Sequence, residues 1–211
     1  IEGRTPPPHL PVVLGHQAVG VIEEGADKGR RVGVAWIASA CGKCEYCKSG
    51  QENLCAQFKA TGRDVDGGYA EYMTVRADFV HPIPAAFSNA EAAPLLCAGA
   101  IGYRSLRLSN LRDGGTLGLM GFGGSNHLVL KMAKYQFTNA KVFVFSRNPE
   151  EREFALSLGA AWAGEINGIP PEALDAVIDT TPVWGPDLEA LKRLKPGGRL
   201  VINAIRKQET D

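Results

Sequence analysis

The chain has 211 residues, 45% of them hydrophobic, which is enough for one large domain or two small ones with real cores. Its 23 lysines and arginines balance its 23 aspartates and glutamates, so no net charge favours nucleic acid or an anionic membrane. The sequence contains no apolar run of about 18 residues and no secretory leader, and we therefore expect a globular, cytoplasmic protein that binds neither nucleic acid nor membrane.

The first half of the sequence, residues 1–100, is rich in strand and loop patterns. Within it, His16 follows Gly15 at the start of an apolar stretch, and Cys97 follows a second apolar segment. By themselves these are weak signals, because an isolated histidine is usually a hydrogen-bonded structural residue and an isolated cysteine usually packs in a core.

Four of the five cysteines form a Cys-x-x-Cys-x-x-Cys-x₇-Cys pattern, namely Cys41, Cys44, Cys47 and Cys55. Four thiolates on a tight polar loop match a tetrahedral zinc site, and adjacent lysines help to keep the thiolates ionised. Disulfides, an iron–sulfur cluster and free thiols remain the alternatives. Because the protein would fill all four positions, such a zinc ion should be structural rather than catalytic.

From about residue 101 onward, strand and helix patterns alternate, which is typical of a doubly wound parallel sheet. The expected strands are 116–120, 141–146, 174–180 and 199–204, and the expected helices are 128–135, 150–158 and 188–194. We therefore predict an α/β protein in which a Rossmann domain, incomplete at its C-terminus, covers residues 101–211. A β-rich domain would cover residues 1–100.

A glycine-rich turn at residues 121–127 follows the first of these strands and opens a helix, as dinucleotide binding requires. Asn126 stands where such turns usually carry glycine or alanine, and this predicts altered pyrophosphate geometry or weaker affinity. A Rossmann-like domain without a ligand is the alternative. The candidate cofactor-binding residues are Gly121, Gly123, Gly124, Ser125, Asn126, Ser146 and Arg147.

The last two of these residues indicate which dinucleotide is preferred. An acidic residue at the end of the second strand would bind the ribose hydroxyls of NAD(H), but this chain has Ser146 and Arg147 there. Serine can donate a hydrogen bond to a 2′-phosphate and arginine can pair with it, so we predict NADP(H) in preference to NAD(H).

Three segments together resemble the zinc-dependent medium-chain alcohol dehydrogenases: residues 15–22, residues 33–55 with the four cysteines, and residues 93–99. The resemblance covers nearly the whole chain. It implies that residues 1–100 form a catalytic domain of the GroES-like type with a structural-zinc lobe. It also implies that His16 and Cys97 are two of the three protein ligands of a catalytic zinc, whose fourth position takes water or the substrate.

In this family the third ligand is a cysteine within Cys-x-Thr-Asp-x-His, a motif that the chain lacks. We therefore expect the sequence to begin just after its own catalytic cysteine and, as it stands, to be unable to complete catalysis. Gln17 replaces the usual glutamate and should support the ligands by hydrogen bonding. Trp36 should either form an aromatic wall of the alcohol pocket or lie buried against the zinc lobe.

The resemblance implies an oxidoreductase that interconverts an alcohol and an aldehyde or ketone with NAD(P)(H), acting as a dimer or tetramer when full-length. One alternative keeps this fold but reduces another carbonyl or enone substrate. A second alternative is a noncatalytic, zinc-stabilised protein that binds a nucleotide. A zinc module for nucleic acid is disfavoured by the balanced charge.

Overall fold

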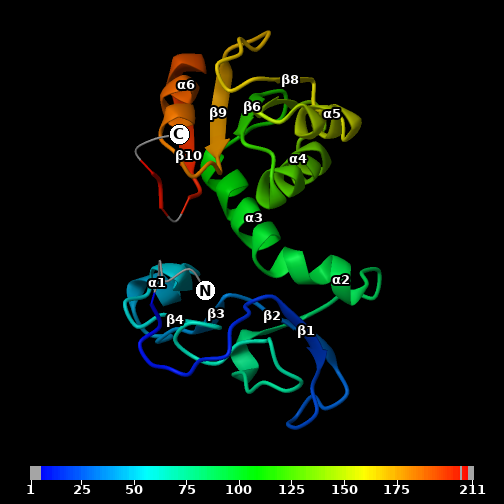
Figure 1. Cartoon of the computed structure of the whole chain (residues 1–211), viewed down its shortest axis with the longest axis vertical. Helices are drawn as coiled ribbons and strands as arrows, with labels where there is room; N and C mark the ends of the chain where they lie inside the picture. The colour runs from blue at the N-terminus through cyan, green and yellow to red at the C-terminus, as the bar shows by residue number, and fades with distance from the viewer. Residues whose placement is uncertain (1–5, 205, 209–211) are drawn as a thin grey trace. The chain divides into compact units, whose positions relative to one another are not determined.

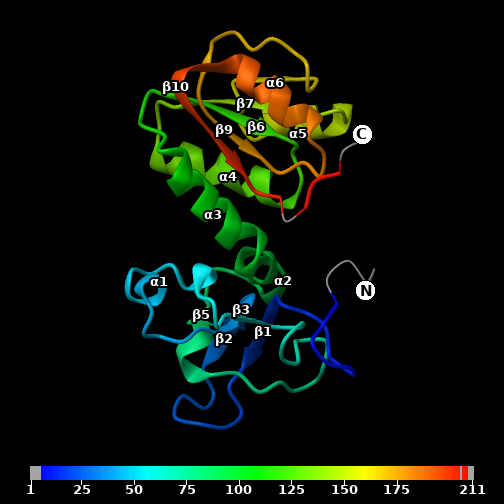
Figure 2. The ribbon, with the colours of Figure 1, turned by 90° about the vertical axis from the view of Figure 1, so that its left-hand side faces the viewer.

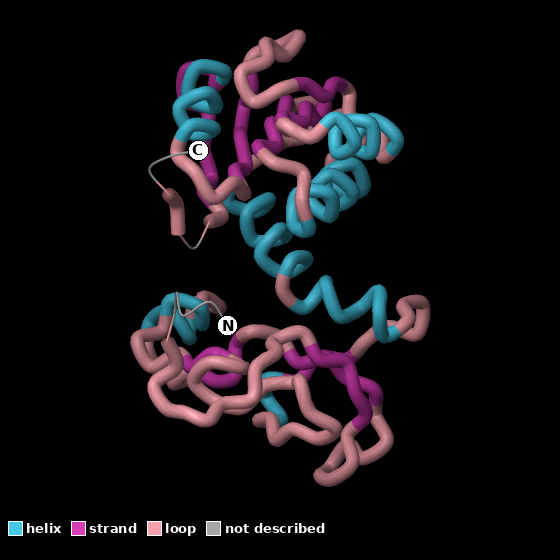
Figure 3. The backbone as a smooth tube through the Cα atoms, in the orientation of Figure 1, coloured by secondary structure: helices cyan, strands magenta, loops and turns pink. Residues whose placement is uncertain are grey.

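The computed structural model describes residues 6–204 and 206–208. The chain divides into two compact units, Ile1–Cys97 and Ala98–Asp211. Loops make up most of the first unit, whereas the second alternates helices and strands (Figure 3). Among the described residues, no helix has both the length and the apolar character needed to cross a membrane.

The first unit is built around a small antiparallel sheet in the order β1-β2-β5. Its strands are β1 (Ala18–Val21), β2 (Arg31–Val34) and β5 (Val80–Pro82). A second strand pair joins β3 (Ile37–Ser39) to β4 (Lys59–Ala60). The helical elements are short: α1 (Glu45–Lys48), η1 (Glu52–Leu54), η2 (Ala77–Phe79), α2 (Asn89–Ala92) and η3 (Ala93–Leu96).

Gly33, in the middle of β2, shows how this small sheet is packed. A Cβ atom at Gly33 would lie 2.7 Å from Cδ2 of Leu96 and 2.8 Å from Cδ1 of Ile83, so the missing side chain makes room for both. Leu96 is buried as a result. Since Leu96 ends η3, this contact fixes the backbone just before Cys97 to the sheet.

The second unit contains a parallel sheet of five strands in the order β10-β9-β6-β7-β8. The strands are β6 (Thr116–Met120), β7 (Lys141–Phe145), β8 (Trp162–Gly164), β9 (Leu174–Asp179) and β10 (Leu194–Ile202). The chain enters at the centre, runs to one edge through β7 and β8, and then crosses over to β9 and β10 (Figure 2). This reversal of strand order is the topological switch point of a Rossmann sheet.

Helices cover both faces of this sheet, which confirms the predicted doubly wound α/β fold (Figure 1). The helices are α3 (Ala98–Ser109), α4 (Gly124–Gln136), α5 (Pro149–Ser157) and α6 (Gly185–Arg193). Val142 and Val144 of β7 pack in one core with residues of α3, α4 and α5. Phe143 and Phe145 point to the other face and pack in a second core that includes Ala190 of α6.

Several predicted boundaries differ from the observed ones. Helix α4 begins at Gly124, four residues earlier than expected, so half of the predicted turn is the first turn of the helix. Strand β10 begins at Leu194 instead of Arg199, because Pro196 and two glycines hide the strand pattern; its pairing with β9 is irregular there. The three-residue strand β8 was not predicted.

Candidate functional site

The four cysteines of the sequence pattern lie together in the first unit. Their sulfur atoms are all within 4.8 Å of one another. The Sγ of Cys47 is 3.5 Å from that of Cys44 and 3.9 Å from that of Cys41. Tetrahedral zinc with Zn–S bonds of about 2.3 Å requires sulfurs about 3.8 Å apart, and the two spacings from Cys47 are close to this value.

The local fold directs backbone amides at these sulfurs. The amide of Cys44 donates to Sγ of Cys41 at 3.3 Å, and those of Cys41 and Gln57 donate to Sγ of Cys55 at 3.4 and 3.3 Å. Amide donors stabilise thiolates over thiols. The cluster is therefore prepared for a cation by its backbone as well as by its side chains.

The protonation of the cluster differs from one sulfur to the next. Hydrogen bonds from the backbone of Lys43 and Cys44 lower the pKa of Cys41 to about 6, whereas burial raises the pKa of Cys47 to about 12. Four adjacent sulfurs cannot all be thiolates without a compensating cation, which a divalent metal would supply.

The second candidate site joins residues that are distant in sequence. Nε2 of His16 lies 3.2 Å from Sγ of Cys97. Two ligands of a tetrahedral zinc ion, one nitrogen and one sulfur, should be about 3.6 Å apart, close to this distance. The hydrogen bond with Cys97 raises the pKa of His16, and the same bond lowers the pKa of Cys97.

His16 is placed by a close approach between two backbone segments. The amides of Gly67, Gly68 and Tyr69 donate to the carbonyls of residues 13, 15 and 14, at 2.8, 3.0 and 2.9 Å. A Cβ at Gly67 would lie only 2.1 Å from the carbonyl oxygen of Gly15, so no other residue fits there. The segment that carries His16 is therefore held along its backbone.

Cys97 is placed by the two short helices that precede it. The Ser88 side chain accepts from the amide of Glu91, and the Glu91 side chain accepts from the amide of Ser88, so α2 starts with a capping box. η3 follows directly and ends at buried Leu96. Cys97 is thus fixed both by this cap and by the sheet.

Two further predicted residues lie in this unit. Gln17 is exposed, and a hydrogen bond from its side chain helps to lower the pKa of Cys97, so it acts on the His16–Cys97 pair. Trp36 is 39% exposed and packs edge-on against Phe58, with ring centroids 5.0 Å apart. Within this unit Trp36 is thus partly exposed, and one side of its ring is covered by Phe58.

In the second unit, the glycine-rich turn has an open backbone. Gly121 has φ of +75°, a conformation that favours glycine, and its amide donates to the carbonyl of Phe145 at 2.8 Å. Gly123 is the N-cap of α4, and a Cβ there would have no described atom within 4 Å. The amides of Gly124 and Ser125 in the first helical turn have no intrahelical acceptor, which suits an anion such as pyrophosphate.

Asn126 occupies the position where a small residue was expected. Its side chain is fully buried, and Nδ2 donates to the carbonyls of Met120 and Gly121 at 3.0 and 2.8 Å and to Oγ1 of Thr180 at 3.1 Å. Asn126 therefore faces the strand ends and holds the turn in place from beneath. Its amide nitrogen is used by the protein rather than being free for a ligand.

The end of β7 brings the two residues that predict NADP(H), Ser146 and Arg147, close to Glu151 and Arg152 of α5. Ser146 is buried, and its hydroxyl donates to the carboxylate of Glu151. Arg147 is exposed. The guanidinium of Arg152 donates to the carbonyls of Ser146 and Arg147 at 2.8 and 3.1 Å.

Comparison with known proteins gives the same family along the chain. Residues 1–85 match the family model of the alcohol dehydrogenase GroES-like domain. The probable alcohol dehydrogenase AdhA of Mycobacterium tuberculosis (strain CDC 1551 / Oshkosh) is 47% identical over 97% of this chain and 62% of its own length. The chain is therefore similar to alcohol dehydrogenases over nearly its whole length, and its first part is similar to their GroES-like domain.

Two further relatives show how much of such a protein the chain represents. An alcohol dehydrogenase of Geobacillus stearothermophilus is 41% identical over 82% of this chain and 51% of its own length. The crystal structure of CAD from Helicobacter pylori complexed with NADP(H) superimposes with a TM-score of 0.84 at 29% identity, covering 94% of this chain and 61% of that one. The chain thus spans between half and two thirds of the length of these relatives.

Two features of the second unit carried no signal in the sequence. One is the contact between Ser146 and Glu151. The other is a buried charge cluster at the carboxyl end of β9, where Nζ of Lys207 lies 2.5 Å from Asp179 and also pairs with Asp187. Burial raises the pKa of Asp179. Neither feature follows a local pattern, because each joins side chains from different elements.

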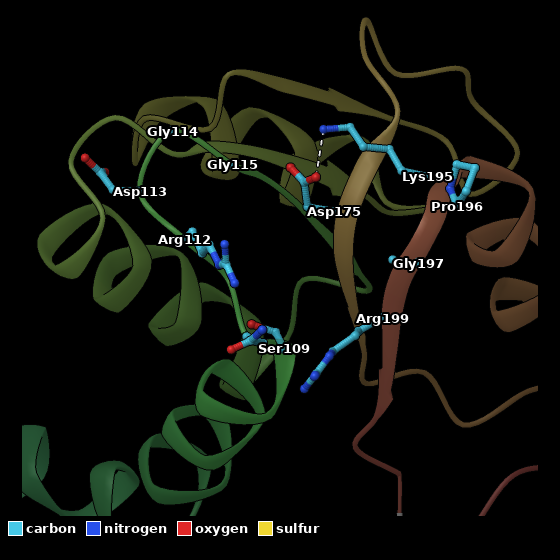
Figure 4. Close-up of a pocket in the computed structure, with 12 residues that line it drawn as sticks. Ser109, Arg112, Asp113, Gly114, Gly115, Asp175, Lys195, Pro196, Gly197 and Arg199 are labelled. Carbon is cyan, nitrogen blue, oxygen red and sulfur yellow. Dashed lines mark hydrogen bonds and ion pairs between the residues drawn. The ribbon is translucent and has the colours of Figure 1, made fainter.

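A pocket of about 440 Å³ lies at the amino ends of the strands of the Rossmann sheet, away from the glycine-rich turn (Figure 4). It is lined by residues 109–110, 112–115, 175 and 195–199, near the amino ends of β6, β9 and β10. The ion pair between Lys195 and Asp175, at 2.8 Å, lies on its wall. None of the predicted site residues lines this pocket, since those of the second unit follow the carboxyl ends of the strands.

Proposed function

We propose that the full-length protein is a zinc-dependent oxidoreductase that interconverts an alcohol and an aldehyde or ketone by hydride transfer to or from NAD(P). The observation that carries this proposal is the pairing of His16 with Cys97, 3.2 Å apart and separate from the four-cysteine cluster. In this proposal a third protein ligand comes from outside these 211 residues. The fourth position is left for water or the substrate oxygen.

The predicted site residues of the first unit have different roles in this proposal. His16 and Cys97 hold a catalytic zinc, which acts as a Lewis acid on the substrate oxygen when it is bound. Gln17 orients the ligands by hydrogen bonding, and Trp36 offers an apolar face to the substrate. Cys41, Cys44, Cys47 and Cys55 hold the structural zinc, for which their spacing is the support.

The second unit is proposed to bind the dinucleotide. Gly121 and Gly123 keep side chains out of the turn, and the amides of Gly124 and Ser125 receive the pyrophosphate, while Asn126 holds the turn. The preference for NADP(H) predicted from Ser146 and Arg147 agrees with the dinucleotide held by the Helicobacter pylori structure. The carboxylate beside Ser146 opposes it, and this balance decides the choice of dinucleotide.

We further propose that residues 1–100 act as the catalytic domain and residues 101–211 as the dinucleotide-binding domain of a homo-oligomer. Cytoplasmic location is proposed because thiolate zinc sites need reduced cysteines. Light scattering on the full-length protein tests the oligomer, with a dimer or tetramer as the expected mass.

The function is tested by counting zinc on the purified full-length protein by elemental analysis. We expect about two zinc ions per chain, and His16→Gln should lose one of them together with alcohol dehydrogenase activity. His9→Gln is the matched control, because His9 is exposed in a loop and should leave both metals in place. One zinc per chain, unchanged by His16→Gln, would refute the proposal.

A further inference from the structure

We propose that Glu151 makes this site select NAD(H) over NADP(H), with Ser146 as the residue through which it acts. The inference rests on the proposed dinucleotide-binding function and reverses the preference that Ser146 and Arg147 suggest in sequence alone. It concerns the chemistry of one position on the cofactor, the 2′ substituent of the adenosine ribose.

Ser146 directly follows β7, at the end of the strand where a Rossmann domain places the adenosine ribose. β7 pairs with β6 in parallel, and Met120 lies opposite Phe145 in the register. The turn that follows β6 is hydrogen-bonded to the end of β7, through the amide of Gly121 and the carbonyl of Phe145. In a Rossmann domain, a dinucleotide whose pyrophosphate rests on the first turn brings its adenosine ribose to the end of the second strand.

The hydroxyl of Ser146 has its single proton already committed. It donates to a carboxylate oxygen of Glu151, and it accepts from the amide of Asn148 at 3.2 Å. Ser146 is 3% exposed, and Glu151 lies in the first turn of α5. The serine that could have donated to a 2′-phosphate therefore presents only an acceptor while this contact holds.

NADP(H) and NAD(H) differ in the hydrogen-bonding group that they carry at this position. A 2′-phosphate is an acceptor with a charge of about −1.5 to −2, so it would meet both an acceptor oxygen and a carboxylate. A 2′-hydroxyl can donate to either of them. The pair formed by Ser146 and Glu151 thus supplies the acidic partner that is missing at the end of the strand itself.

Two arginines nearby do not cancel this effect. Arg152 directs its guanidinium at the backbone carbonyls of residues 146 and 147, where it closes the loop. Arg147 is exposed, so its charge is screened by solvent, whereas Glu151 is partly buried and in direct contact with Ser146. Arg152 is as buried as Glu151, but its guanidinium contacts the backbone, so the charged group in contact with the Ser146 hydroxyl is the carboxylate.

The experiment measures binding, not turnover, on the full-length protein. Nicotinamide fluorescence gives the dissociation constants of NADH and NADPH for the wild-type protein and for Glu151→Gln, Glu151→Lys and Glu150→Gln. The last variant is the matched control, because it removes the same charge from the same helical turn, while the structure gives the Glu150 side chain no contact with Ser146. Circular dichroism checks that each variant is folded.

We expect the wild-type protein to bind NADH more tightly than NADPH. Glu151→Gln should reduce this ratio by about tenfold, Glu151→Lys should reverse it, and Glu150→Gln should change it by less than about twofold. Tighter binding of NADPH by the wild type, or equal shifts in Glu150→Gln and Glu151→Gln, would overturn the inference while leaving dinucleotide binding intact. Failure to bind either cofactor would instead refute the proposed function and the inference with it.

Discussion

At the scale of single residues, Asn126 carries more of the structure than its place in a glycine-rich turn suggests. Its side chain is fully buried and bridges the ends of β6 and β9 by donating to Met120, Gly121 and Thr180. A glycine or alanine would leave part of this space empty and could not make these bonds. The turn is therefore held by side-chain hydrogen bonds in addition to its own backbone geometry.

Replacing Asn126 by alanine should destabilise the second unit. The substitution removes this donor from the Gly121 carbonyl, which costs about 1–3 kcal/mol of unfolding free energy, whereas the Met120 carbonyl keeps the amide of Thr180 as a donor. Urea denaturation followed by circular dichroism measures the change. Ser125→Ala, at the preceding residue, serves as the control. If both variants unfold at the same urea concentration as the wild type, the bridge contributes nothing to stability.

The residues of the candidate sites differ in how far sequence could identify them. The four cysteines carry their own signal, because their ligand spacing is local, within 14 residues. His16 and Cys97 are 81 residues apart, and only a family resemblance could pair them. Glu151 was missed because its role depends on the rotamer of Ser146, which no pattern in the chain encodes.

At the scale of elements, α2 and η3 show how a short helical segment fixes a functional residue. The capping box of Ser88 and Glu91 starts the segment, and Leu96 ends it in the core of the first unit. A four-residue helix has little intrinsic stability, so the cap supplies a large part of what keeps it helical.

Ser88→Ala should therefore lower the stability of the first unit by about 1 kcal/mol, since the amide of Glu91 loses its partner. Thermal unfolding of the zinc-loaded protein measures this loss. Ser157→Ala is the control, because Ser157 bonds a carbonyl near the C-terminal end of α5 and caps no amide. A loss in Ser157→Ala as large as that in Ser88→Ala would argue against the capping explanation.

The elements that sequence predicted well are those with a strong apolar pattern. β6, β7 and β9 consist mostly of apolar residues, with their polar residues at or next to the strand ends, as expected for buried parallel strands. β10 was predicted too short because Pro196 and Gly197 look like a turn, although they lie within the strand. The start of α4 was placed too late because glycine is a poor helix former, whereas here two glycines open the helix.

At the scale of the whole molecule, the chain consists of two units that differ in what stabilises them. The second unit has two large apolar cores, on the two faces of its sheet. All four clustered cysteines lie in the first unit, which has short strands and long loops. Metal binding should therefore contribute to the stability of the first unit alone.

Removing zinc should affect the two units unequally. After treatment with a chelator, we expect amide hydrogen exchange to accelerate in β3, β4 and the loop between them, because the metal no longer joins its four sulfurs. Amides in β6, β7 and β9 should keep their protection. Mass spectrometry of peptides from each unit measures this contrast, and a uniform rise in exchange across both units would contradict it.

The different sequence separations of the two sulfur sites set an order for events during protein synthesis. Closing the loop of 81 residues between His16 and Cys97 costs about 1.6 kcal/mol more chain entropy than closing the 14 residues of the four-cysteine cluster. The four cysteines can therefore come together while the rest of the chain is still being translated. The His16–Cys97 pair forms only after translation has passed residue 97, so in the proposed function its metal site would be completed later than the four-cysteine cluster.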